Sequence, residues 1–195
     1  VAYRDVTDTA LKVARYVGSG GTGCVGSAAW TCVSVDTAND VGGSVNSIAF
    51  DSSGNAWVSY SDGTLAALKV AKYVGSGGTG CASAAWTCTT VDDPANSVGV
   101  ASSIAFDAAG NAWVSYQDTT ASDLKVARYV GSRGTGCTST AWTCTTVESP
   151  NLTGANTSLA FDLSGTPWVS YQDSTASSLK VAKLHLPPTP LGPSR

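Results

Sequence analysis

The chain has 195 residues, a formal net charge of −3 and 13% charged residues against 43% hydrophobic residues. It carries no excess of basic residues to neutralise phosphates, which argues against nucleic-acid binding, and no apolar run is long enough to cross a bilayer. The hydrophobic content exceeds that of disordered chains, so we expect a folded core.

An internal repeat of about 56 residues dominates the sequence. Leu-Lys-Val-Ala and Trp-Val-Ser-Tyr recur, beginning at Leu11, Leu68, Leu124 and Leu179, and at Trp57, Trp113 and Trp168. Residues 1–5 match residues 169–173, so the chain opens inside a repeat, and it closes inside another. We predict a partial repeat over 1–46, complete repeats over 47–102 and 103–157, a partial repeat over 158–185, and a proline-rich tail over 186–195.

Each repeat holds short segments rich in β-branched and aromatic residues and bounded by Gly, Asp, Asn and Ser, a composition typical of β-strands. In the middle repeat these segments are 103–106, 112–116, 124–130 and 141–147. Counting such segments along the whole chain predicts fourteen strands. No stretch keeps a helical apolar period, so we expect almost no helix.

The first two strands of each repeat are joined by five residues with Asp first and Gly fourth, beginning at Asp51, Asp107 and Asp162. This order predicts a type I turn whose glycine takes a positive φ. A calcium loop would need more acidic residues. A second set of carboxylates recurs at Asp62, Asp118 and Asp173. We expect both sets to make hydrogen bonds in turns and at strand ends.

Lysines recur at Lys12, Lys69, Lys125 and Lys180, each followed three residues later by a second cation, at Arg15, Lys72, Arg128 and Lys183. Positions three apart in a strand point to opposite faces of the sheet. We expect each cation to pair with an Asp of the same or the next repeat, or to be solvated.

The six cysteines fall in three local pairs, Cys24 with Cys32, Cys81 with Cys88 and Cys137 with Cys144. Their even number and strict repetition predict three disulfides, each closing the loop that enters the fourth strand. Such disulfides indicate an oxidising compartment. The spacing does not fit a zinc site, and the only histidine is His185.

The remaining motifs do not indicate a cofactor or a catalytic centre. The loops at 18–23 and 75–80 match Gly-x-Gly-x-x-Gly, but a strand and not a helix follows each, which argues against a phosphate site. No nucleophile constellation accompanies His185. We predict no cofactor, no metal site and no catalytic residue.

Recurring aromatic residues are the candidates for ligand binding, because aromatic platforms between sheets stack on sugar rings. The candidates are Trp30, Trp86, Trp142, Tyr60, Tyr116 and Tyr171. The alternative role for such rings is packing between neighbouring sheets.

The pattern Ser-x-Ala-x-Asp-x-x-Gly-Asn-x-x-Val-Ser-Tyr-x-Asp, followed by Leu-Lys-Val-Ala, stands at 47–62 and 103–118, with a close third copy at 158–173. It resembles the β-propeller repeats of bacterial extracellular proteins, with kelch-like or NHL-like blades. The resemblance implies an all-β, β-propeller-like fold of about 3.5 four-stranded repeats, with the Ala-Phe-Asp strand innermost and no catalytic residues. The alternative fold is a β-trefoil, which would leave two of the strands over.

We therefore expect a secreted or cell-surface, non-enzymatic structural or adhesion module that assembles through open propeller ends. The expected partners are copies of itself, as a homo-oligomer or head-to-tail array, or the remainder of a longer chain. The alternative is a lectin-like propeller that binds glycans at one equivalent site per blade. Less favoured is a part of a glycosidase or lyase.

Overall fold

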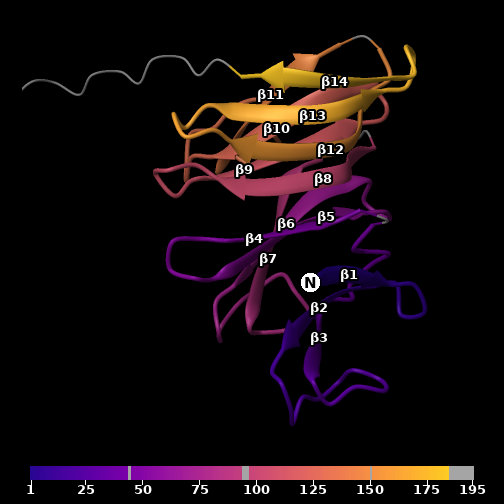
Figure 1. The fold of residues 1–195 in the computed structure, drawn as a ribbon, viewed down its shortest axis with the longest axis vertical. Helices are drawn as coiled ribbons and strands as arrows, with labels where there is room; N and C mark the ends of the chain where they lie inside the picture. The colour runs from indigo at the N-terminus through magenta and orange to yellow at the C-terminus, as the bar shows by residue number, and fades with distance from the viewer. Residues whose placement is uncertain (44, 94–96, 150, 185–195) are drawn as a thin grey trace, which may run out of the picture.

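The computed structural model describes residues 1–43, 45–93, 97–149 and 151–184, which contain fourteen β-strands and no helix. The strands form four antiparallel sheets (Figure 1). The predictions of an all-β chain and of fourteen strands are confirmed. The predicted tail, residues 186–195, and His185 lie outside the described residues.

Each sheet is made of strands that follow one another along the chain. The first sheet contains β1 (Ala2–Asp5), β2 (Ala10–Tyr16) and β3 (Trp30–Asp36). The second contains β4 (Ser47–Phe50), β5 (Ala56–Asp62), β6 (Ala67–Tyr73) and β7 (Trp86–Asp92). The third contains β8 (Val98–Phe106), β9 (Ala112–Asp118), β10 (Asp123–Tyr129) and β11 (Trp142–Glu148). The fourth contains β12 (Thr153–Phe161), β13 (Pro167–Asp173) and β14 (Ser178–Lys183).

The sheets follow one another along the long axis of the molecule, from the indigo first sheet to yellow β14 (Figure 1). The hydrophobic core is divided into three clusters, and each takes its residues from two neighbouring sheets. Between the third and fourth sheets, for example, Trp113, Leu124 and Val126 face Leu159, Val169 and Tyr171. We call these contacts the first, second and third junctions, numbered along the chain.

The opening strands of the third and fourth sheets begin earlier than the sequence predicts. β8 begins at Val98 and not at residue 103, and two register shifts against β9 lie between these positions. Gly99 crosses the preceding sheet here, where a Cβ atom would stand 2.6 Å from the Cα of Leu68, and its φ is +87°. A glycine that looks like a strand breaker is therefore required by a close backbone approach. β12 begins early in the same way, at Thr153, next to Gly154.

The turns that begin with Asp51, Asp107 and Asp162 form as predicted. The N–H of Gly54 donates to the carbonyl of Asp51 at 2.9 Å, and the φ of Gly54 is +79°. The carboxylate of Asp51 accepts the N–H of Asn55 and the indole Nε1–H of Trp57. Each turn thereby fixes the tryptophan that opens the following strand segment.

The three predicted disulfides are present: Cys24–Cys32, Cys81–Cys88 and Cys137–Cys144. The loops closed by the second and third disulfides reach back to the preceding sheet. The N–H of Ser83 donates to the carbonyl of Val35 at 3.2 Å, and that of Ser139 donates to Val91 at 3.1 Å. Each of these disulfides therefore holds a loop that joins two sheets.

The β-trefoil alternative requires a closed barrel, and the strand order among the described residues contains none. Within the same residues, no helix has the length and hydrophobicity that a membrane span requires. Three disulfides are typical of a protein that folds in an oxidising, extracellular-type environment.

Candidate functional site

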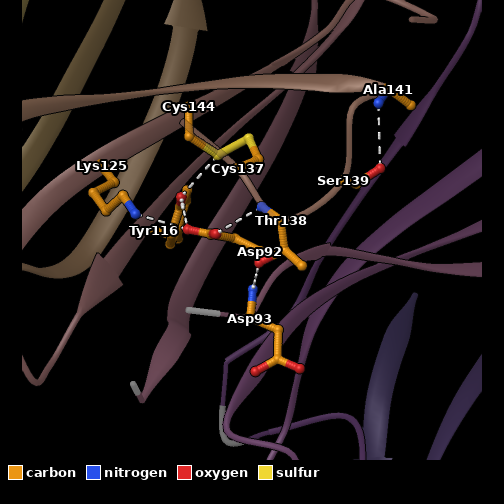
Figure 2. Close-up of a disulfide and its surroundings, with 9 residues drawn as sticks. All are labelled: Asp92, Asp93, Tyr116, Lys125, Cys137, Thr138, Ser139, Ala141 and Cys144. Carbon is orange, nitrogen blue, oxygen red and sulfur yellow. Dashed lines mark hydrogen bonds and ion pairs between the residues drawn. A yellow bond between two sulfur atoms is a disulfide. The ribbon is translucent and has the colours of Figure 1, made fainter. Parts of the chain in front are cut away.

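A buried ionic cluster connects the sheets at each junction. At the second junction, Asp92 is the last residue of β7, and its Oδ2 accepts hydrogen bonds from the third sheet (Figure 2). Tyr116 donates its hydroxyl at 2.7 Å and Lys125 donates its ammonium at 2.7 Å. Asp92 is 1% exposed and Tyr116 is fully buried. One carboxylate therefore binds two strands of the next sheet.

The other junctions repeat this cluster with residues at equivalent positions. They use Asp36 with Tyr60 and Lys69 at the first junction, and Glu148 with Tyr171 and Lys180 at the third. A second carboxylate from the lysine's own sheet completes the ion pairs at both, Asp62 at 3.6 Å from Lys69 and Asp173 at 2.7 Å from Lys180. The expected pairing with an Asp of the same repeat is confirmed at these two junctions. The expected pairing with the next repeat is wrong, because the other carboxylate that holds each lysine comes from the preceding repeat.

The cluster fixes the charge state of its members. Burial alone would raise the pKa of Asp36, but hydrogen bonds from Lys69 and Tyr60 outweigh it and hold that pKa below the ordinary value. Burial and the nearby carboxylates raise the pKa of Tyr60 far above its ordinary value. At the less buried third junction the same effects raise the pKa of Tyr171 to about 12. At neutral pH Asp36 is therefore charged, and Tyr60 and Tyr171 are neutral donors.

The disulfide loop adds further bonds to the cluster at the second junction (Figure 2). The N–H of Thr138 donates to Oδ1 of Asp92 at 3.3 Å, and the hydroxyl of Thr138 accepts the N–H of Asp93 at 2.8 Å. The hydroxyl of Tyr116 lies 3.1 Å from Sγ of Cys144. The disulfide, the ionic cluster and the loop therefore act on one point of the junction.

The first sheet has the same lysine in a different setting. Lys12 contacts Asp5 of its own sheet at 2.6 Å and Asp8 at 2.9 Å. Asp8 lies in the turn between β1 and β2, where the other repeats carry Leu65, Ala121 and Ala176. Asp8 therefore provides Lys12 with the second carboxylate that the preceding sheet provides to Lys69, Lys125 and Lys180.

The six aromatic candidates divide into two groups. Tyr60, Tyr116 and Tyr171 are at most 4% exposed, and their hydroxyls donate to the junction carboxylates. They therefore lie inside the junctions, away from any open surface. Trp30, Trp86 and Trp142 each pack edge-on against a tyrosine that ends the third strand of the repeat, with ring centroids 5.3 Å apart.

Two cavities lie at equivalent places in the first two junctions. The cavity at the second junction has a volume of about 330 Å³ and is lined by residues that include Asp51, Trp57, Lys72, Tyr129 and Trp142. The cavity at the first junction is larger, about 510 Å³, and its lining includes Trp30 and Trp86. The structure thus places the three tryptophan candidates at these cavities.

A cation–π contact that recurs in the repeats borders the cavity at the second junction. The ammonium of Lys72 lies 4.8 Å from the ring centre of Trp57, whose indole N–H donates to Asp51 at 3.1 Å. Arg128 stacks on Trp113 and Lys183 stacks on Trp168 in the same way. Lys69 faces the preceding sheet, and Lys72 lines the cavity toward the next sheet with Tyr129 and Trp142, as the three-residue spacing predicts.

The outer face of the fourth sheet is apolar, and no other element of the described residues covers it. Trp168 is 38% exposed, Leu179 is 79% exposed and Val181 is 59% exposed. Their equivalents in the third sheet, Trp113, Leu124 and Val126, are at most 4% exposed, because the fourth sheet covers them. We call Trp168, Leu179 and Val181 the end face.

Sequence reasoning missed the acid of the ionic cluster. It considered the aspartates of the turns and second strands, but the main acceptors are Asp36, Asp92 and Glu148 at the ends of the outer strands. The sequence feature that could have revealed this acid is the carboxylate that ends each fourth strand, at the same position in every repeat. Within residues 1–43, 45–93, 97–149 and 151–184, no group of three or more His, Cys, Asp or Glu residues is arranged to hold a metal ion.

A scan against protein-family models and a search of curated proteins find no match to this chain.

We predict that Asp92→Ala lowers the free energy of unfolding by about 3 kcal/mol or more, because it leaves Lys125 and Tyr116 without their buried acceptor. Asp8→Ala is the matched control. It removes an exposed carboxylate while Asp5 still holds Lys12, so it should change stability little. Urea denaturation measures both variants, and equal losses would contradict a special role for the buried cluster.

Proposed function

We propose that this chain is a non-enzymatic, extracellular structural or adhesion module built from β-propeller blades, which associates with a second copy of itself through the end face. The observation that carries the proposal is the uncovered apolar surface of Trp168, Leu179 and Val181. The four antiparallel sheets, packed in chain order, support the interpretation of each sheet as a propeller blade. Propellers typically contain about four to eight such sheets. The three disulfides support an extracellular location.

The three internal junctions indicate what covers the end face. In each of them, one sheet packs the residues equivalent to those of the end face against the tyrosine and lysine face of the next sheet. These residues are Leu11 and Val13 in the first sheet, Trp57, Leu68 and Val70 in the second, and Trp113, Leu124 and Val126 in the third. The first sheet carries such a face, with Tyr3 and Lys12 at the positions of Tyr171 and Lys180. Burying leucine, valine and tryptophan side chains is the main driving force for association of this kind.

The charges of the first sheet favour the same arrangement. The fourth sheet has no outer strand among the described residues, so it contributes no carboxylate equivalent to Glu148. Lys12 already has an equivalent partner in Asp8. A head-to-tail contact between two copies would therefore bury the lysine together with its own counter-charge, and would leave no unpaired ion in the interface.

We predict that the double variant Leu179→Asp/Val181→Asp is monomeric while the unchanged chain forms particles of at least twice its mass of 19.6 kDa. Two carboxylates on the end face would have to be buried without partners in the complex. Size-exclusion chromatography with light scattering over a concentration series measures the masses.

The control for this experiment is Leu163→Asp, which makes the same kind of change on the same sheet. Leu163 is fully exposed in the turn between β12 and β13, so this variant should assemble like the unchanged chain. An unchanged chain that stays at 19.6 kDa at the highest concentration would overturn the proposal, as would assembly by the double variant.

A second candidate function is glycan binding at the second junction. The cavity there combines two aromatic walls, Trp57 and Trp142, with the polar groups Asp51 and Lys72, and apolar cavities with a few convergent polar groups are typical binding sites. We predict that a glycan array probed with the chain gives signals that Lys72→Ala reduces. An array without signals would exclude this candidate and leave assembly unaffected.

A further inference from the structure

The cavity at the second junction opens to solvent between the second and third sheets, which both have four strands. Three of its lining residues, Ser52, Thr89 and Tyr129, are exposed. Its volume is about 330 Å³, at the small end of the range for ligand cavities, which is about 300–1,000 Å³. A small ligand group can therefore enter it from solvent while both sheets stay in place.

The carboxylate of Asp51 lines this cavity, but its acceptor sites are already occupied. Its Oδ1 accepts the N–H of Ser53 at 3.0 Å and the N–H of Asn55 at 2.9 Å. Its Oδ2 accepts the side-chain amide of Asn55 and the indole N–H of Trp57, both at 3.1 Å. A carboxylate offers about four lone-pair sites, so Asp51 has none left for a hydroxyl group of a ligand.

The ammonium of Lys72, in contrast, has unused donors. Among the residues that the structure describes, it has no hydrogen-bond or ion-pair partner, and it lies 4.8 Å from the ring centre of Trp57. The equivalent cation at the third junction, Arg128, lies 3.8 Å from the carboxylate of Asp107. An ammonium has three donors and no acceptor. Lys72 therefore brings to the cavity a positive charge that no neighbouring carboxylate neutralises.

Hydroxyl groups add further donors to the lining. Those of Ser52, Thr87 and Thr89 make no hydrogen bond within the described part of the chain. A hydroxyl can rotate to donate its hydrogen to a ligand. The side chains of the cavity are therefore rich in unused donors, while their one carboxylate, Asp51, is fully occupied. The ligand group that complements such a lining accepts hydrogen bonds and carries a negative charge, as a carboxylate does.

The aromatic wall of the cavity is held in place and remains accessible. Tyr129 is 36% exposed, and its ring packs edge-on against Trp142, at 5.3 Å between ring centres, and against Trp57, at 6.0 Å. A ring fixed on two sides and open to solvent can stack on a flat, partly apolar group. The cavity therefore combines a site for an anion with a surface for a sugar ring.

We propose that the cavity at the second junction binds a carboxylated sugar, a hexuronic acid unit of an acidic glycan, with its carboxylate on the ammonium of Lys72 and its ring on Tyr129. This proposal rests on glycan binding, the second candidate function above, and adds the charge of the ligand. The small volume favours a planar carboxylate over a bulkier sulfate ester. Hydrogen bonds between an ammonium and a carboxylate are about twice as strong as neutral ones.

The net charge of the chain does not prevent this binding. The value of −3 opposes the approach of an anion, but charges more than about 8 Å away are largely screened at physiological salt. The donors that line the cavity therefore decide the affinity for a short oligosaccharide.

The experiment compares two ligands that differ in charge alone. They are the trisaccharide of galacturonic acid and the same trisaccharide with every carboxylate converted to its methyl ester. Isothermal titration calorimetry measures their binding to the full chain. We expect saturable binding of the acid that weakens as salt is added, and about tenfold weaker binding of the ester, the loss expected for one charged hydrogen bond.

Two variants of the chain form a matched pair that locates the site. Lys72→Met removes the ammonium and keeps an unbranched side chain, so it should weaken binding of the acid about tenfold and change binding of the ester little. Arg133→Met removes one positive charge from an exposed residue outside the cavity lining and should leave binding of the acid unchanged. Neither side chain belongs to a buried ionic cluster, so both variants should keep the thermal unfolding midpoint of the unchanged chain.

The outcomes separate this proposal from glycan binding itself. Equal binding of the acid and the ester, or equal losses with Lys72→Met and Arg133→Met, would overturn the proposal and leave glycan binding standing. Tighter binding of a sulfated galactose trisaccharide than of the galacturonate would also overturn it, because the bound anion would then be a sulfate. A glycan array without any signal would remove the second candidate function and this proposal together.

Discussion

A carboxylate at the end of each outer strand, buried against a tyrosine and a lysine of the next sheet, is the interaction on which this structure depends. The hydrophobic clusters supply most of the burial, but apolar contacts are non-directional. Charged hydrogen bonds from two different strands to one carboxylate oxygen fix how one sheet sits on the next. A shift of either sheet would leave a buried ion without a partner, which is costly.

The disulfide and the opening glycine of the third sheet support the same junction as Asp92. The disulfide Cys137–Cys144 fixes a loop whose Thr138 N–H donates to the same carboxylate. Gly99 lets the next strand pass over the preceding sheet. The end face is the place where this arrangement lacks a neighbouring sheet among the described residues. The proposed assembly follows from applying the geometry of the internal junctions to the end face.

Much of this architecture could be predicted from the sequence, because the repeat is local in character. The fourteen strands, the turn at Asp51 and its equivalents, and the pairing of the cysteines depend on residues close together in the chain. The early start of β8 could not be predicted, since only the approach to Leu68 explains Gly99. The buried role of Tyr116 could not be predicted either, because its acceptor, Asp92, comes from the preceding repeat.

The most direct test of the central claim is a double-mutant cycle on Asp92 and Lys125, with unfolding free energies measured for Asp92→Asn, Lys125→Met and the combination. If the carboxylate and the ammonium are joined across the junction, the double variant should lose less stability than the two single losses combined, with a coupling of about 1 kcal/mol or more. Losses that add within about 0.5 kcal/mol would show two independent residues and would contradict the account.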